Sequence, residues 1–244
     1  MKERKDSIVI QKPELAGLID HTILSPDATA NDIKELCLQA KRFGFANVCI
    51  NPCYITTALK ELYGSSVGVC AVVGFPLGAC DPDVKAAEAL AAVKAGASEI
   101  DVVINIGYLK SGMTEKFKED LAGVVKSVRQ EMPGTVVKFI LETCLLSDSE
   151  KIEACRFAVE AGADYVKTST GFGKSGATVH DVKLLKDTVG PKIGVKASGG
   201  IRSLSTAIAM IDAGARRIGT SSGVQIIEEY ETIRRIDADL HKLL

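Results

Sequence analysis

The chain has 244 residues, of which 46% are hydrophobic, and its formal net charge is −1. This balance provides no basic surface for nucleic acid or for an anionic membrane, and no apolar run is long enough to cross a bilayer. The N-terminal segment lacks the apolar core of a signal peptide. Seven scattered cysteines without a C-x-x-C pair fit reduced thiols in a cytoplasmic protein better than a disulfide framework or a zinc site.

A repeated pattern runs along the chain. Four segments end an amphipathic helical pattern, pass through Gly44, Gly96, Gly162 or Gly214, and continue into an apolar strand. Glycine just past the end of a helix is the expected left-handed cap. The spacing between these glycines is about twice the length of one βα unit, so the repeat predicts eight units in the chain.

Eight predicted strands alternate with helical patterns. The strands cover residues 17–22, 47–51, 67–75, 99–105, 136–142, 164–169, 192–198 and 216–221. Strict alternation predicts a parallel sheet, and eight units in a chain of this length predict an α/β fold, a single (β/α)8 TIM-type barrel domain spanning residues 1–244. An open doubly wound sheet is the alternative, but it would need a G-x-G-x-x-G turn after the first strand, where the chain reads IDHTILSPDA.

Charged side chains are predicted to point into this barrel. Strand side chains alternate between two faces, and the apolar row Ile193, Val195 and Ala197 should face the helices, which turns Lys196 inward. The same reasoning places four more charged residues in the lumen: Asp20, Asp101, Lys138 and Lys167. An ion network that only joins the strands is the alternative, but three lysines and two aspartates on one surface favour a functional site.

Lys167 and Lys196 occupy matching places near the ends of neighbouring strands. Two ammonium groups about 5 Å apart repel by roughly 3 kcal/mol at an effective dielectric constant of about 20. Together with partial burial, this repulsion would lower the pKa of one amine to about 7–8, where it can attack a carbonyl to form a Schiff base. Asp101 or Asp20, with a bound water, would then move protons during carbon–carbon bond chemistry.

Glycine-bearing loops after the last three predicted strands indicate an anion site. They read TSTGFG (168–173), SGGIRS (198–203) and GTSSG (219–223). Glycines let backbone N–H groups approach a phosphate, and barrels of this type hold phosphate after strands seven and eight. Gly199, Gly200, Ser221 and Ser222 fit such a site.

Seven motifs occur in order between about Leu15 and Gly223: IDHT, VCINP, EIDVVINIG, VKFILET, YVKTSTGFG, VKASGGIR and GTSSG. With them the chain resembles the deoxyribose-phosphate aldolases, class I aldolases on a (β/α)8 barrel. The resemblance implies reversible cleavage of 2-deoxy-D-ribose 5-phosphate to D-glyceraldehyde 3-phosphate and acetaldehyde, without a metal or other cofactor. It also implies a cytoplasmic homo-oligomer, a dimer or tetramer, that binds neither nucleic acid nor membrane.

The resemblance further implies residue roles. Lys167 would form the Schiff base, Lys196 would perturb its pKa or shuttle a proton, and Asp101 would activate the catalytic water. Asp20 and Lys138 would complete the polar network. The implied substrate-binding residues are Cys49, Thr168, Gly171, Gly199, Gly200, Gly219, Ser221 and Ser222. Cys49 would lie where it could react with aldehydes.

Two features depart from the pattern of some family members. Where those members have a lysine after the glycine of the sixth-strand loop, this chain has Phe172, so phosphate binding would rest on backbone N–H groups, Lys174 or Arg202. Some members also end in a tail with a terminal tyrosine, whereas the last tyrosine here, Tyr230, falls inside a predicted helix.

Other functions remain open from the sequence. One is a different Schiff-base barrel, such as another sugar-phosphate aldolase or a transaldolase; another is a phosphosugar-binding module without catalysis. The paired lysines and Asp101 favour the aldolase. His21 follows Asp20 and suggests a His–Asp dyad, but alternation puts it on the opposite face, so we expect a structural role.

Overall fold

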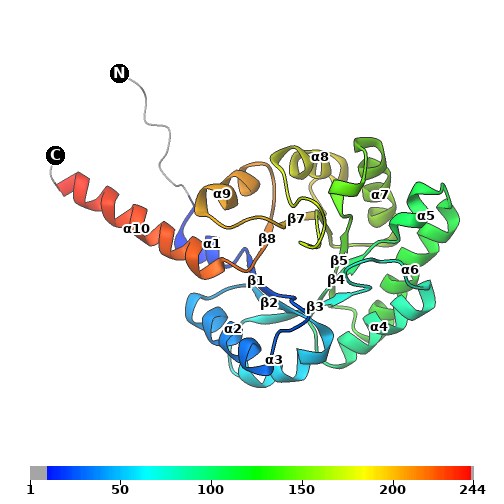
Figure 1. Cartoon of the computed structure of the whole chain (residues 1–244), viewed down its shortest axis with the longest axis horizontal. Coiled ribbons are helices and arrows are strands. Elements are labelled where there is room, and N and C mark those ends of the chain that lie inside the picture. Colours follow the sequence, from blue (N-terminus) through cyan, green and yellow to red (C-terminus); the bar gives the residue numbers. More distant parts are fainter. Residues whose placement is uncertain (1–9, 243–244) are drawn as a thin grey trace.

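Eight parallel strands form a closed barrel in which each strand pairs with the next and the last pairs with the first. The computed structural model describes residues 10–242, with side chains described through residue 236. Figure 1 shows the ring of strands and the helices around it. The strands are β1 (Ile19–Ile23), β2 (Asn47–Ile50), β3 (Gly68–Val73), β4 (Glu99–Val103), β5 (Val136–Ile140), β6 (Tyr165–Lys167), β7 (Gly194–Ser198) and β8 (Arg217–Thr220).

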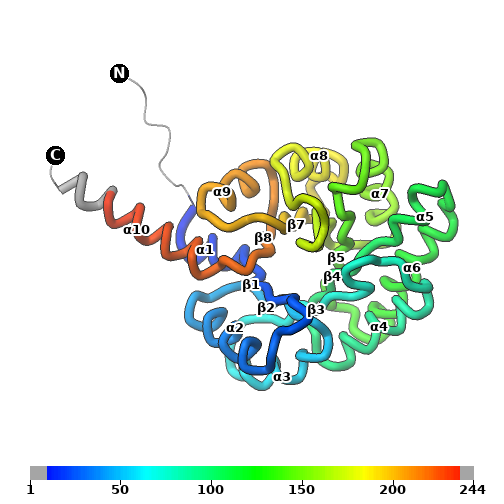
Figure 2. The backbone as a smooth tube through the Cα atoms, in the orientation of Figure 1, coloured from blue at the N-terminus to red at the C-terminus, as the bar shows by residue number. Residues whose placement is uncertain are grey.

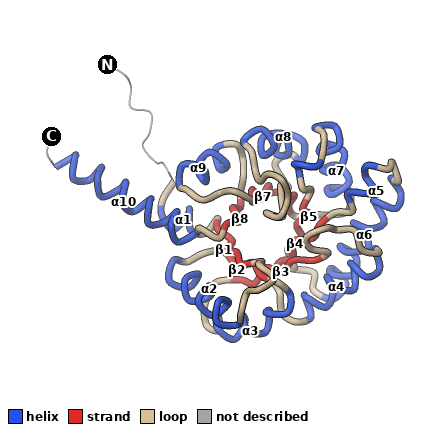
Figure 3. The backbone as a smooth tube through the Cα atoms, in the orientation of Figure 1, coloured by secondary structure: helices blue, strands red, loops and turns tan. Residues whose placement is uncertain are grey.

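The helices form an outer layer around the strands, as Figures 2 and 3 show. They are α1 (Lys12–Ala16), α2 (Ala30–Phe43), α3 (Ile55–Glu61), α4 (Pro82–Lys94), α5 (Ile106–Lys110), α6 (Thr114–Glu131), α7 (Asp148–Ala161), α8 (Val179–Val189), α9 (Leu204–Asp212) and α10 (Gly223–Lys242), with the short 3-10 turns η1 (Pro52–Tyr54) and η2 (Thr143–Leu145). The predicted (β/α)8 barrel is therefore confirmed. The prediction of one domain over residues 1–244 includes positions 1–9 and 243–244, which lie outside the described residues.

Local sequence signals explain where helices begin and end. The α2 helix starts at a capping box, in which Thr29 Oγ1 accepts a hydrogen bond from Asp32 N and the Asp32 carboxylate accepts one from Thr29 N. It ends at Gly44, whose φ of 71° lies in the left-handed region that glycine adopts without strain. Gly162 caps α7 in the same way, whereas the capping residues of α4 and α9 are alanines in helical conformation, Ala95 and Ala213, which stand one residue before Gly96 and Gly214.

Two layers of apolar packing flank the strands. The larger cluster lies between strands and helices and includes Val195 and Ala197, as the alternation in β7 predicts. A small second cluster contains Leu24, Cys49, Cys70 and Val72. Charged side chains also point into this barrel's interior, whereas barrels of this type usually fill their interiors with branched apolar residues.

The last tyrosine, the cysteines and the helices can be compared with the corresponding predictions from the sequence. Tyr230 lies in α10 as predicted, and its hydroxyl donates a hydrogen bond to the backbone oxygen of Ile10 over 3.1 Å. The seven cysteines all belong to the described part of the chain, and each is a free thiol. None of the described helices has both the length and the apolar character that a membrane crossing requires.

Candidate active site

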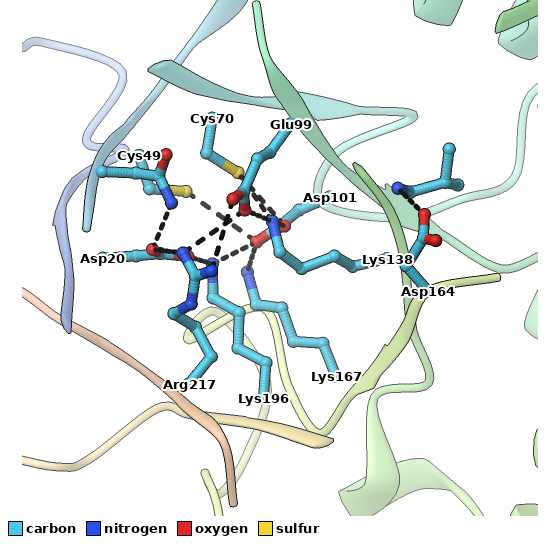
Figure 4. A network of polar contacts seen from close by, with 12 residues as sticks. Asp20, Cys49, Cys70, Glu99, Asp101, Lys138, Asp164, Lys167, Lys196 and Arg217 are labelled. Carbon is cyan, nitrogen blue, oxygen red and sulfur yellow. Dashed lines mark hydrogen bonds and ion pairs between the residues drawn. The ribbon is translucent and has the colours of Figure 1, made fainter. Parts of the chain in front are cut away.

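The register of neighbouring strands brings the charged residues together. Lys167 of β6 is the register partner of Lys196 of β7, and Asp101 of β4 is the partner of Lys138 of β5. Register partners in adjacent strands lie about 4.8 Å apart and point to the same face, so their side chains meet inside the barrel. Figure 4 shows these side chains converging on Asp101.

Asp101 is the centre of the cluster. Its Oδ2 accepts hydrogen bonds from Lys167 Nζ and Lys196 Nζ, each over 2.7 Å, so the two amines are no more than twice that distance apart. Its Oδ1 accepts from Lys138 Nζ over 2.9 Å and from Cys70 Sγ over 3.1 Å. The three lysines that alternation places in the lumen thus all contact Asp101.

Asp20 forms the second half of the network. Its Oδ2 contacts Lys196 Nζ, and its Oδ1 accepts from Asn47 Nδ2 over 2.8 Å and from Arg217 Nη1 over 2.7 Å. Glu99 then pairs with both Arg217 and Lys138. All five predicted lumen residues therefore belong to one network.

Sequence reasoning missed four members of this network: Asn47, Cys70, Glu99 and Arg217. Strand alternation could have predicted two of them, Glu99 and Arg217, as residues that point into the barrel. Glu99 shares a strand face with Asp101, and Arg217 shares one with the predicted pocket residue Gly219. Both were overlooked because they stand at the beginnings of β4 and β8, whereas chemistry in barrels collects at strand ends.

Opposite charges decide which protonation states the cluster favours. Burial alone would raise the pKa of Asp101, but the ammonium groups of Lys138, Lys167 and Lys196 hold that pKa well below its ordinary range. Burial alone would lower the pKa of Lys196, but the carboxylates of Asp101 and Asp20 raise it well above its ordinary value. Asp101 is therefore a carboxylate and Lys196 an ammonium group in the resting protein.

These pairings change the electrostatic argument drawn from the sequence, which considered only repulsion between two ammonium groups. A carboxylate oxygen lies between them and attracts both. The network holds four cationic side chains, Lys138, Lys167, Lys196 and Arg217, but three acidic ones, Asp20, Glu99 and Asp101. Lys167 pairs with one carboxylate and each other cation with two, so Lys167 is the least compensated cation.

A cavity of about 310 Å³ opens above this network. Among the described residues, Lys167 is the one lysine that lines it, and the lining also includes Arg202 and Phe172. The side chain of Lys167 is 2% exposed, whereas those of Lys138 and Lys196 are 0% exposed. Lys167 thus stands between the cavity and the buried charges.

Most of the predicted binding residues line this cavity: Gly171, Gly199, Gly200, Gly219 and Ser221. Three others, Thr168, Cys49 and Ser222, lie outside its lining. Thr168 is fully buried, and its hydroxyl donates to the backbone oxygen of Ser198 over 3.0 Å. Cys49 is fully buried below the cavity, with Sγ 3.9 Å from Asp101 Oδ2. The third, Ser222, donates its N–H to Thr220 Oγ1 over 2.9 Å.

Two similar turns border the cavity. Thr170 Oγ1 accepts from Phe172 N over 3.0 Å after β6, and Thr220 Oγ1 accepts from Ser222 N after β8. In each turn the middle residue, Gly171 or Ser221, lines the cavity, and no acceptor within residues 10–242 binds its N–H. Arg202 lines the same cavity and Lys174 does not, which favours Arg202 between the two cations considered from the sequence.

His21 lies apart from the charged network. Its Nε2 is 2.7 Å from Gln39 Oε1 on α2, and its ring packs against Phe45. Burial lowers the pKa of His21, which favours the neutral ring. Alternation in β1 therefore placed this residue correctly on the face opposite Asp20.

Two clusters of possible metal ligands fall inside the site: Asp20, Cys70 and Glu99, whose two carboxylates both pair with Arg217, and a cluster that contains Asp101. The ligand atoms of Cys49, Cys70 and Asp101 all lie within 4.8 Å of one another. Asp101, however, already accepts hydrogen bonds from three lysines, and their ammonium groups would repel a cation placed there. The electrostatics of this cluster thus oppose a metal.

The fold and the site together define a (β/α)8-barrel enzyme in which one lysine faces a cavity at the carboxyl ends of the strands, above a buried acid–base network. The chain belongs to the DeoC/LacD family of aldolases, whose family model matches residues 15–229. It is therefore an enzyme of the lyase class.

Proteins named deoxyribose-phosphate aldolase are similar to this chain over nearly its whole length. The one from Caldanaerobacter subterraneus subsp. tengcongensis is 54% identical over 231 residues, which cover 95% of this chain and 98% of the relative. The one from Carboxydothermus hydrogenoformans is 56% identical and covers 90% of this chain and 96% of its own length. A structure from Aeropyrum pernix, described as a tetrameric deoxyribose phosphate aldolase, superposes with a TM-score of 0.83 at 39% identity and covers 91% of this chain and 93% of that one.

Proposed function

We propose that this enzyme reversibly cleaves 2-deoxy-D-ribose 5-phosphate to D-glyceraldehyde 3-phosphate and acetaldehyde through a Schiff base on Lys167. The similarity to deoxyribose-phosphate aldolases supports the substrate. One observation carries the mechanism: Lys167 lines the cavity while Lys138 and Lys196 are fully buried beneath it. A substrate carbonyl that enters the cavity therefore meets one amine.

The first step needs Lys167 as a neutral amine. The network holds one more cation than carboxylates, so loss of the Lys167 proton balances its charge. The amine attacks C1 of the open-chain sugar, and loss of water from the resulting carbinolamine gives a protonated Schiff base. This new cation occupies the position of the lysine ammonium, where Asp101 Oδ2 can accept a hydrogen bond from its N–H.

Bond cleavage follows from this cation. A water held by Asp101 takes the proton of the C3 hydroxyl, the C2–C3 bond breaks, and its electron pair moves through C2 into the iminium group. D-Glyceraldehyde 3-phosphate leaves, and an enamine remains on Lys167. Protonation of the enamine at C2 and hydrolysis of the Schiff base release acetaldehyde and restore the amine. The water held by Asp101 can return the proton that it took from the C3 hydroxyl, while Lys196, whose raised pKa keeps it an ammonium group, donates a hydrogen bond to Asp101 over 2.7 Å.

The phosphate end of the substrate would lie against the turns after β6 and β8. The N–H groups of Gly171 and Ser221 are oriented by neighbouring hydrogen bonds and are available for an anion. Gly199, Gly200 and Arg202 line the same cavity. Backbone N–H groups and one guanidinium are a common combination for binding phosphate.

The decisive experiment traps the Schiff base with acetaldehyde and borohydride. We expect the peptide that contains Lys167 to gain the mass of one ethyl group and the Lys167→Arg protein to gain none. A protein that binds phosphosugars without this chemistry would give no adduct, and alkylation of Lys196 instead would contradict the assignment. Comparing cleavage of deoxyribose 5-phosphate with that of fructose and keto-acid phosphates separates this function from other Schiff-base barrels.

We further propose that the chain assembles into a homo-oligomer, a dimer or tetramer, and works in the cytoplasm. The relative from Aeropyrum pernix, which is described as tetrameric, supports assembly. The free thiols of Cys49 and Cys70 inside the barrel fit a reducing compartment. Light scattering after gel filtration tests the first proposal, and a monomer at micromolar concentration would contradict it.

A further inference from the structure

Glu142 has an unusual backbone conformation immediately beyond β5. Its φ of 53° and ψ of 63° lie in the left-handed region, and it is the one non-glycine residue with a positive φ among residues 10–242. Residues with a Cβ atom adopt this region at an energetic cost, and such conformations concentrate at functional sites. The side chain is buried, with 4% of the residue exposed.

The buried carboxylate of Glu142 is bound by the loop that follows β6. Its Oε2 accepts hydrogen bonds from the backbone N of Thr170, over 3.3 Å, and from the Thr170 hydroxyl. Gly173 packs against the same carboxylate, since a Cβ atom at that position would lie 2.9 Å from Oε1. No lysine or arginine of the described chain pairs with Glu142, so these loop contacts are its main compensation for burial.

The contacts continue to the cavity. Thr170, whose hydroxyl donates to Glu142, accepts a hydrogen bond from Phe172 N over 3.0 Å. The N–H groups on both sides of Gly171 are thereby fixed, and Gly171 lines the cavity together with Lys167. The Phe172 ring is placed as well, edge-on to Phe75 with the ring centres 5.4 Å apart.

We propose that Glu142 is a positioning residue whose buried carboxylate fixes the loop of residues 170–173 so that Gly171 N–H points at the substrate phosphate. This inference rests on the proposed function, because it requires a phosphate in the cavity. Glu142 itself does not line the cavity, so it acts through Thr170.

The turn after β8 can be compared with the turn after β6, where the Thr170 hydroxyl donates to the Glu142 carboxylate. In the turn after β8, the Thr220 hydroxyl donates to a neutral acceptor, the backbone oxygen of Ile201, over 2.6 Å. The turn therefore does not require a buried charge. The β6 loop runs from Thr168 to Thr178 before α8 begins, whereas Ser221 and Ser222 alone separate β8 from α10. A hydrogen bond to a carboxylate is roughly twice as strong as one between neutral groups, which suits the longer loop.

The test uses variants that separate the carboxylate from the backbone. Glu142→Gly keeps the left-handed conformation without strain and removes the carboxylate, whereas Glu142→Gln keeps an acceptor oxygen. Thr170→Val breaks the same connection. Thr188→Val is the matched control, because the Thr188 hydroxyl donates within α8, to Leu184 O over 2.7 Å. Each protein is assayed for kcat and KM on 2-deoxyribose 5-phosphate and on 2-deoxyribose.

We expect Glu142→Gly to raise KM for the phosphorylated sugar about tenfold or more, the usual effect of losing an anchoring hydrogen bond to a charged group. Cleavage of the phosphate-free sugar should stay within about twofold of the parent protein. Glu142→Gln should restore most of the phosphate preference. Combining Glu142→Gly with Thr170→Val should add little, because both changes break one connection.

Binding of inorganic phosphate, measured as a shift in the melting temperature, gives a readout independent of turnover. The parent protein should be stabilised by phosphate and Glu142→Gly clearly less. Equal losses on both sugars, or equal phosphate binding by the two proteins, would overturn the role of Glu142. If the parent bound phosphate more tightly than Glu142→Gly but did not cleave deoxyribose 5-phosphate, the proposed function alone would fail.

Discussion

Replacing Lys196 with methionine tests the charge balance of the network directly. The change removes one of four cations and leaves three cations facing three carboxylates, so the network no longer has an excess of positive charge. The amines of Lys167 and Lys196 both lie 2.7 Å from Asp101 Oδ2, so they are at most twice that distance apart. At about 5 Å and an effective dielectric constant of about 20, the lost repulsion is roughly 3 kcal/mol, which corresponds to about a hundredfold in the rate of a step that needs an uncharged amine.

The assay is the initial rate of borohydride-dependent alkylation by acetaldehyde, measured from pH 5 to pH 10. We expect Lys196→Met to react about a hundredfold more slowly at neutral pH and its rate profile to move to higher pH. Circular dichroism would check that the fold is retained. An unchanged pH profile in a folded Lys196→Met protein would refute the electrostatic reasoning.

Glu99→Gln provides a control of opposite sign. It removes a carboxylate that pairs with Lys138 and Arg217 but does not contact Lys167. The excess of positive charge grows, so the neutral form of Lys167 becomes more favourable and the alkylation profile should move to lower pH. Shifts of the same sign in both variants would point to a general disturbance of the site.

Three further predictions concern other parts of the site. Lys167→Ala should abolish turnover and borohydride trapping while circular dichroism and melting temperature show an intact fold, and any remaining specific cleavage would contradict the Schiff-base assignment. Arg202→Ala should raise KM for deoxyribose 5-phosphate roughly tenfold, whereas Lys174→Ala should leave it near the parent value, because Arg202 alone of these two lines the cavity. Acid should destabilise the protein. The native-state pKa values of Asp20 and Asp101 lie below their ordinary value of 3.8. The two carboxylates therefore contribute to the free energy of unfolding above about pH 4, and this contribution is lost as the pH falls below that value. Urea unfolding across this range should show that loss, and a free energy of unfolding independent of pH below 4 would contradict it.

Periodicity in the sequence was sufficient to predict the barrel. Helix-end glycines at regular spacing indicated eight units, and period-two alternation assigned Lys167 and Lys196 to the lumen. These signals are local, and they predict the fold correctly because a one-residue shift in strand register would move every apolar strand residue to the wrong face of the sheet. The predicted strands exceed the observed ones by a few residues, as in β6, which covers only Tyr165–Lys167.

The contacts within the site could not be predicted in the same way. Whether Asp101 shares one oxygen between two lysines depends on the stagger of β4 relative to β6 and β7, which no local pattern specifies. The carboxylates that reverse the simple repulsion argument also come from strands far apart in the sequence. Alternation within the predicted strand 136–142 puts Glu142 on the same face as Lys138, but β5 ends at Ile140 and the left-handed turn directs the Glu142 carboxylate to the β6 loop.

The charge network itself argues against a purely structural role. Breaking a buried ion network by removing one partner is destabilising, yet replacing a whole network with apolar residues is often neutral or stabilising, so stability alone does not explain it. A network that only joined strands would match its charges and seal every amine. This one has an excess cation, and the cation with the fewest carboxylate partners is the lysine that lines the cavity. Covering Lys167 in the way that Lys138 and Lys196 are covered would remove the amine that a carbonyl substrate can reach, and in the structure Lys167 lines the cavity instead.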